Sequence, residues 1–288
     1  MRALLLVAAL LGPAAPAAAQ GVVATDDRGQ TIRLARPAQR VVALGPHLTE
    51  LVFAAGGGAR VVGVLRYSDF PDAARALPIV GDAFALNLER IAQLKPDLVI
   101  VWHSGIAQRQ REQLYALGVP VFESEIRSVA GIAATLARLG TLLGTQAAAD
   151  AEAAALLRRW RALQARYAER APVRVFYQLW HAPLMTINGE HLIAQAITAC
   201  GGVNVFAALP ALTPTVSWEA AAQADPQLIA TARVDGQGTP QGRWAELVGV
   251  DAVRRGRYAL LPPDLLGRMG PRFIDGAQVL CEAIDAAR

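Results

Sequence analysis

The stretch TQAAADAEAAALLRRWRALQARYAER, residues 145–170, decides how the chain is organised. It is rich in alanine, leucine, glutamine, glutamate and arginine, which favour the α-helix. Its apolar stripe consists of residues three or four positions apart: Leu156, Trp160, Leu163 and Tyr167. A helix of about 25 residues is about 37 Å long. An ordinary surface helix would show the same pattern, but its central position favours a connecting backbone helix over 145–171, ended by Pro172.

Short β-branched runs alternate with helical periods on both sides of this helix, which predicts parallel sheets covered by helices. Before it, we expect strands at 40–44, 61–64, 97–102 and 120–123 and helices at 87–94, 108–117 and 129–143. After it, we expect strands at 173–180, 227–231 and 258–261 and helices at 191–199, 218–222 and 273–286. The predicted fold is α/β, with two Rossmann-like lobes at 20–144 and 172–288. No internal repeat is recognised.

Residues 1–19 have the organisation of a secretory signal peptide. A positive start at Arg2 precedes an apolar run over 3–11, and small residues end at Ala19. The apolar run is shorter than the roughly 20 residues needed to span a bilayer. We therefore expect export to the periplasm with cleavage near Ala19, and no lipid anchor, because no cysteine stands at the cleavage site.

The composition indicates a globular protein, with 53% hydrophobic and 18% charged residues. The net charge of +4 is scattered and includes no basic run, so nucleic-acid binding is not expected. The glycines at 56–58 follow a helix and do not open one after a strand, so they do not form a phosphate loop. Ser68 and Ser104 lack a nucleophile-elbow pattern. We expect neither an enzyme nor a bound cofactor.

The only cysteines are Cys200 and Cys281. In an oxidising compartment two such residues favour a disulfide, whereas in the cytosol they would be two buried thiols. We expect a bond between them that pins the last helix to the second half of the chain.

Three of the four histidines, His47, His103 and His181, each follow an expected strand. Ligand-binding loops of α/β sheets lie at the carboxyl ends of strands. Three imidazoles from two lobes would suit zinc or another borderline metal. The alternative, which we prefer, is that each is a polar loop residue of a pocket.

A set of stretches in the order of the chain carries a family resemblance. They are RVVALGPHLTELVFAAG (40–56), YSDFP (67–71), NLERIAQLKPDLVIVW (87–102), RQREQLYALGVPVF (109–122), VFYQ (175–178), CGGVNVF (200–206), VSWE (216–219) and DLLGRMGPRFIDGAQVLC (264–281). Together they resemble periplasmic cobalamin-binding proteins of ABC importers, which belong to the helical-backbone class of solute-binding proteins. The resemblance runs from about residue 40 to 285.

The resemblance implies a ligand site between the lobes. Cobalamin is a large, nearly planar macrocycle fringed by amides, so its site needs flat apolar surfaces and a few polar groups. The matching positions here are Tyr67, Trp102, Asp264 and Arg268. The sequence departs from the family where tryptophan is expected near Phe84, where Leu179-Trp180 replaces a phenylalanine-glycine pair, and at Thr213. Phe84 and Trp180 are expected to supply equivalent surface.

The resemblance also implies the partners. One glutamate on each lobe, Glu89 and Glu219 here, would dock on an ABC permease that works with its ATPase. With one stiff helix between the lobes, the hinge should move little when ligand binds. We also expect the protein to be a monomer.

Two other ligands remain open. A haem or ferric-siderophore carrier of the same class is the first alternative, since Tyr67, His103 or His181 could act as an axial ligand of haem. A metal-ion protein that uses the histidines is the second.

Overall fold

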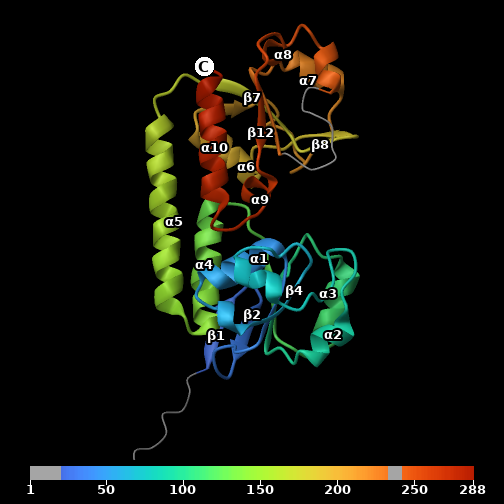
Figure 1. Cartoon of the computed structure of the whole chain (residues 1–288), viewed down its shortest axis with the longest axis vertical. Coiled ribbons are helices and arrows are strands. Elements are labelled where there is room, and N and C mark those ends of the chain that lie inside the picture. Colours follow the sequence, from blue (N-terminus) through green and yellow to red (C-terminus); the bar gives the residue numbers. More distant parts are fainter. Residues whose placement is uncertain (1–20, 233–241) are drawn as a thin grey trace, which may run out of the picture.

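The computed structural model describes residues 21–232 and 242–288 and has two lobes joined along one side by helices (Figure 1). The predicted signal peptide lies outside the described residues. Each lobe has a four-stranded parallel sheet flanked by helices, which confirms the predicted α/β class. Within the described ranges, no helix is both long and apolar enough to cross a membrane.

The N-terminal lobe has the strand order β4-β3-β5-β6. Its strands are β3 (Val41–Leu44), β4 (Val61–Val64), β5 (Leu98–Trp102) and β6 (Val121–Ser124). Its helices are α1 (Pro46–Ala54), α2 (Leu88–Gln93), α3 (Gln108–Tyr115) and α4 (Val129–Leu143). The central strands β3 and β5 are continuous apolar runs, as expected of parallel strands buried on both faces. A hairpin of β1 (Val22–Thr25) and β2 (Thr31–Leu34), which the sequence analysis missed, packs on α4.

The C-terminal lobe has the strand order β10-β7-β11-β12. Its sheet consists of β7 (Val173–Gln178), β10 (Gly202–Asn204), β11 (Leu228–Ala232) and β12 (Tyr258–Leu261). Its helices are α6 (Leu192–Ala199), α7 (Trp218–Gln223), α8 (Asp251–Arg254), α9 (Pro263–Leu266) and α10 (Phe273–Ala286). The strand expected over 173–180 is wrong at its end, because the chain leaves the sheet after Gln178 and forms a hairpin of β8 (Trp180–His181) and β9 (Leu184–Met185).

The helix expected in the middle of the chain is α5 (Gln146–Tyr167), with 22 residues and a length of about 33 Å. All four residues of its apolar stripe are buried. It packs on α4 of the first lobe and on α10 of the second, so the three helices form one side of the molecule (Figure 1). Gly144, in the left-handed conformation at φ 64°, ends α4. At Gly140 a Cβ would lie 2.5 Å from that of Ala149, so this glycine permits the close approach of α5.

The two lobes repeat one local segment, which corrects the expectation of no internal repeat. ERIAQLKPDLVI (89–100) and EAAAQADPQLIA (219–230) are identical at five of twelve positions. Each runs from a short helix into a central strand, α2 into β5 and α7 into β11. The residues at the seventh position, Lys95 and Asp225, both have a positive φ, 46° and 41°. The repeat is weak in the sequence because alanines replace the larger apolar residues in the second copy.

The predicted disulfide is confirmed, because Cys200 at the end of α6 is bonded to Cys281 in α10. Both sulfurs are fully buried. The bond fixes the last helix on the C-terminal lobe, at the side where α10 also contacts α5.

Candidate ligand-binding site between the lobes

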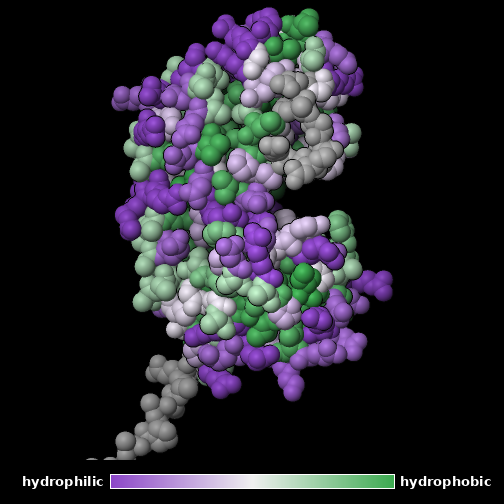
Figure 2. Space-filling view, in the orientation of Figure 1, coloured by the Kyte–Doolittle hydropathy of each residue, from purple (hydrophilic) through white to green (hydrophobic). Residues whose placement is uncertain are grey.

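The molecule is hollowed between the two lobes on the side away from α5 (Figure 2). The loops after the strands meet across this gap. Arg268, which lies beyond β12, donates a hydrogen bond to the carbonyl oxygen of Tyr67, which lies beyond β4. The carboxyl ends of both sheets therefore face the cleft, where α/β proteins bind ligands.

Three of the expected aromatic residues have exposed rings. Tyr67 is 73% exposed, Phe84 is 92% exposed and Trp180 is 42% exposed. Tyr67 has a φ of 70°, which is uncommon for a residue other than glycine. The loop that holds Tyr67 is fixed by a hydrogen bond from Thr49 Oγ1 to Ser68 Oγ (3.1 Å). Exposed rings that the surrounding loops fix in place are available to a ligand.

Phe84 stands at the tip of a turn whose backbone is organised by Asp82. The carboxylate of Asp82 accepts hydrogen bonds from the N–H groups of Phe84 (2.9 Å) and Ala85 (3.0 Å). Trp180 comes from the β8–β9 hairpin, and its indole N–H donates to the carbonyl of Ala182 (3.1 Å). Its neighbour Leu179 is half-buried and packs against the core. Leu179 thus offers less surface than Trp180.

Trp102 is half-buried at the end of β5, where its ring lies edge-on to the imidazole of His47, with 5.1 Å between ring centroids. Trp102 Nε1 and His47 Nε2 are both buried and have no hydrogen-bond partner among residues 21–232 and 242–288. Burial, and next the charge of Arg268, lower the pKa of His47 to about 3, so its imidazole is neutral at physiological pH.

Arg268 joins the two lobes through its guanidinium. It contacts Glu50 Oε1 (2.9 Å) and Asp69 Oδ1 (2.6 Å) of the first lobe and Asp264 Oδ1 (3.6 Å) of its own lobe. Burial would raise the pKa of Asp69, but the hydrogen bond and charge of Arg268 outweigh it and hold this pKa below its usual value. Sequence reasoning paired Arg268 with Asp264 alone and missed Glu50 and Asp69, although an acidic residue on the buried face of a helix is itself a signal.

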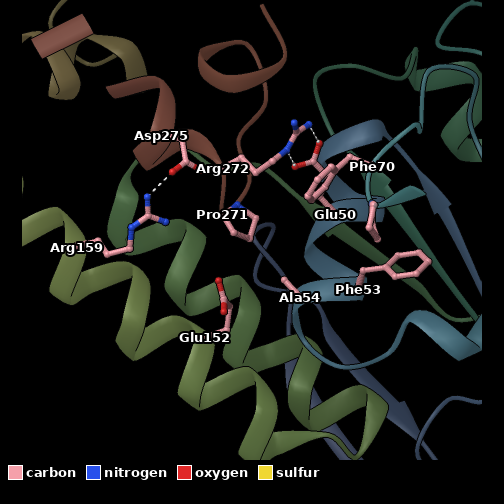
Figure 3. A pocket seen from close by; sticks show the side chains of 10 residues that line it. Glu50, Phe53, Ala54, Phe70, Glu152, Arg159, Pro271, Arg272 and Asp275 are labelled. Atoms are coloured by element: carbon pink, nitrogen blue, oxygen red, sulfur yellow. Dashed lines mark hydrogen bonds and ion pairs between the residues drawn. The ribbon is translucent and has the colours of Figure 1, made fainter. Parts of the chain in front are cut away.

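A second cavity, of about 380 Å³, lies on the side of α5 (Figure 3). Arg272 at the start of α10 donates to Glu50 Oε1 (2.6 Å) and Oε2 (2.9 Å) across this cavity, and Arg159 of α5 forms an ion pair with Asp275. These contacts connect α1, α5 and α10. They hold the hinge side of the molecule together, as expected of a stiff connection.

The three histidines do not form a shared metal site, so that alternative is wrong for this structure. His47 packs on Trp102, His103 pairs with Glu123 through Nδ1, and His181 is exposed beside Trp180. Within the part of the chain that the structure describes, no three His, Cys, Asp or Glu residues are placed to hold a metal ion. The sequence could show that each follows a strand, but not that their side chains diverge.

The two glutamates expected to dock on a permease occupy matching places. Glu89 and Glu219 are exposed, each two residues beyond the N-cap residue of a short helix, Asn87 for α2 and Ser217 for α7. The pKa of Glu219 is held below its usual value by its own backbone N–H and by Ser217. Both helices lie at the outer ends of the lobes, on the side away from α5 (Figure 1).

Comparison with known proteins gives one consistent family. The model of the periplasmic binding protein family matches residues 41–265. The vitamin B12-binding protein of Vibrio cholerae is 34% identical over 254 residues, which cover 88% of this chain and 91% of that protein. The vitamin B12-binding protein of Yersinia pestis is 35% identical over 249 residues, with 86% and 87% covered.

Solved structures agree. The crystal structure of the periplasmic vitamin B12-binding protein BtuF of Vibrio cholerae superimposes with a TM-score of 0.79 at 32% identity, covering 87% of this chain and 98% of that one. The periplasmic heme-binding protein BhuT, in complex with two hemes, gives a TM-score of 0.76 at 26% identity, with 86% and 98% covered. The chain is therefore a substrate-binding protein and not an enzyme, and it belongs to the periplasmic binding protein family.

Proposed function

We propose that this protein captures cobalamin or a related corrinoid between its lobes and delivers it to an ABC permease. The observation that supports the proposal is a set of aromatic side chains from both lobes, at the end of β5 and on the segments that follow β4 and β7. Exposed rings of Tyr67 and Phe84 come from one lobe and that of Trp180 from the other, and Trp102 lies at the end of a central strand. A flat macrocycle gains most from such surfaces. The vitamin B12-binding relatives, similar along nearly the whole chain, support the same ligand.

Haem is the second candidate, because Tyr67 carries an exposed phenol that suits axial ligation. The heme-binding structures share the fold at lower identity than the vitamin B12-binding one. Of the other residues considered for this role, His103 is engaged by Glu123 and His181 remains exposed. A ferric siderophore is disfavoured, because Arg268 and Arg272, two arginines near the cleft and hinge, are already paired with carboxylates.

Titration calorimetry of the mature protein tests the ligand. We expect cyanocobalamin to bind one to one without added metal, and Trp102→Ala to weaken binding by about 2 kcal/mol, or about thirtyfold, as for a buried aromatic hot spot. Phe53→Ala is the control. The Phe53 ring packs against Gly58 near the hinge-side cavity, so its removal should leave affinity unchanged. Tight binding of haemin with no heat from cyanocobalamin would contradict the corrinoid assignment.

Delivery rests on the matching glutamates of the lobes. Glu89 and Glu219 point out from equivalent segments, so one receptor with a pair of equivalent basic sites would engage both. We infer export to the periplasm from the signal-peptide pattern at 1–19. The amino-terminal sequence of the protein recovered from periplasm should begin near Gln20.

A further inference from the structure

A polar network with a buried centre lies in the N-terminal lobe, next to the turn that follows Trp102. Its centre is Glu123 of β6, whose side chain is almost fully buried. One carboxylate oxygen accepts a hydrogen bond from the hydroxyl of Tyr115, and the other contacts His103 Nδ1 and lies 3.6 Å from Arg111 Nε. Burial would raise the pKa of Glu123, but the hydrogen bonds from Tyr115 and His103, with the charge of Arg111, keep it below its usual value. The carboxylate is therefore ionised and holds Arg111 in place.

Arg111 in turn fixes the turn that follows β5, residues 103–106. Its Nη1 donates to the carbonyl oxygens of both His103 (2.5 Å) and Ile106. The turn is held at three further points: His103 N–H to Ser124 O, Ser104 N–H to Glu125 Oε2, and Ile106 N–H to Trp102 O. One guanidinium thus bonds two carbonyls of the turn, whose local backbone bond runs from Ile106 N–H to the preceding Trp102.

The indole of Trp102 lies directly on this turn. A Cβ added at Gly105 would lie 2.0 Å from Trp102 Cε3, so the ring rests on the backbone of Gly105. His47 meets the ring edge-on at 88°. Because the indole is packed between a turn and an imidazole, a shift of the turn must move the ring.

We propose that Arg111, held by the Glu123 carboxylate, is a positioning residue that sets the orientation of Trp102 for the ligand. Arg111 reaches this part of the lobe through the carbonyl oxygens of His103 and Ile106, so we expect it to affect the ligand by way of Trp102. The inference rests on the proposed function in one respect, that Trp102 contacts the ligand.

A double-mutant cycle separates positioning from general stabilisation. Cyanocobalamin affinity is measured by calorimetry for the wild type, Arg111→Met, Trp102→Ala and the double variant. We expect Arg111→Met to weaken binding about tenfold, the size of one lost hydrogen-bonded charged group. In the Trp102→Ala background the same change should alter affinity less than about twofold, because the ring through which Arg111 acts is gone.

Matched variants sharpen the result. Arg109 is exposed on the same helix, α3, so Arg109→Met should leave affinity unchanged. Arg111→Lys, which keeps a charged donor, should recover part of the lost affinity. If Arg111→Met does not fold, Glu123→Gln and Gly105→Ala replace it in the same cycle, and both should weaken binding only when Trp102 is present.

The outcomes are distinguishable. No binding of cyanocobalamin to the wild type contradicts the proposed function, and the cycle is then run with the ligand that does bind. Equal losses from Arg111→Met with and without Trp102 would show a general structural role and overturn the proposal. Unchanged affinity of Arg111→Met in the wild-type background would overturn it as well.

Discussion

Each lobe has a four-stranded parallel sheet and one copy of the repeated segment, but the segments that face the cleft are held in place differently in the two lobes. In the N-terminal lobe, charged side chains such as Arg111 hold a short turn directly under Trp102. In the C-terminal lobe, Trp180 extends on a hairpin outside the main sheet, and the Cys200–Cys281 bond lies at the opposite side, between α6 and α10. The parts that match carry the outward-facing glutamates, and the parts that differ face the cleft. If the proposed function is correct, we expect docking to depend on the segments that the lobes share and ligand choice on the segments that differ.

The largest expected effect is on the C-terminal lobe, where Cys281→Ser should lower the free energy of unfolding by about 4 kcal/mol in the loop-entropy model. The bond closes a loop with a sequence separation of 81. Urea unfolding of the oxidised wild type and of the variant measures the difference. Cys200→Ser with Cys281→Ser serves as the control and should match the single variant. A loss below about 1 kcal/mol would mean that packing of α10 holds this lobe without the bond.

In the N-terminal lobe, the buried His47 should make stability depend on pH. Its folded pKa of about 3 lies below the ordinary 6.5, so between these values the unfolded chain binds the proton first and the free energy of unfolding falls as pH falls. His191, half-buried at the start of α6, has a pKa lowered to about 4 by burial and adds to the slope.

We expect His47→Gln to reduce this slope by up to about 1.4 kcal/mol for each pH unit, the value for one proton. Urea unfolding at several pH values from 6.5 downward measures it. His181→Gln, on the exposed hairpin of the other lobe, is the control. An unchanged slope in His47→Gln would show that this imidazole is hydrated in the folded protein.

The smallest effect on ligand affinity is expected where the lobes match. Glu89→Ala with Glu219→Ala should change the dissociation constant for cyanocobalamin less than about twofold, because both carboxylates are exposed on the outer ends of the lobes. Transport into cells or vesicles that contain the permease should nevertheless be abolished. Glu112→Ala with Glu246→Ala, an exposed pair away from the repeated segment, controls for loss of charge. Lost ligand binding in the first variant would place those glutamates in the cleft.

Local signals in the sequence predicted the regular elements well. Val129–Leu143 and Phe273–Ala286 are helices with the expected ends, because periodic apolar residues, and for the first helix the Ser128 cap, are encoded nearby. The β1–β2 hairpin was missed because its strands are half exposed and lack the continuous apolar run that marks a buried four-residue strand such as β3. The strand predicted over 173–180 ends too late, because the apolar residues Leu179 and Trp180 resemble a continuation of β7 although the chain leaves the sheet after Gln178.

The site was harder to predict, because contacts between distant residues decide it. Tyr67 and Phe84 are exposed, as a ligand surface requires. Glu50 could be recognised as an acidic residue on an apolar helix face, but nothing in the sequence indicated that it would pair with Arg268, 218 positions away. The partner of His103 also comes from another strand, Glu123, and was not among the residues considered. Spacing along the chain places a residue at a strand end, and only the folded structure shows which side chains meet there.

A pair of crystal structures, with and without cyanocobalamin, tests the central claim most directly. Because α5 packs on both lobes and the contacts of Glu50 with Arg268 and Arg272 tie them together, we expect the lobes to rotate only slightly. The corrin ring should lie in the cleft, against Trp102 and between the lobes. A ligand bound elsewhere, or a wide rotation of the lobes that breaks the Glu50–Arg268 contact, would contradict the account.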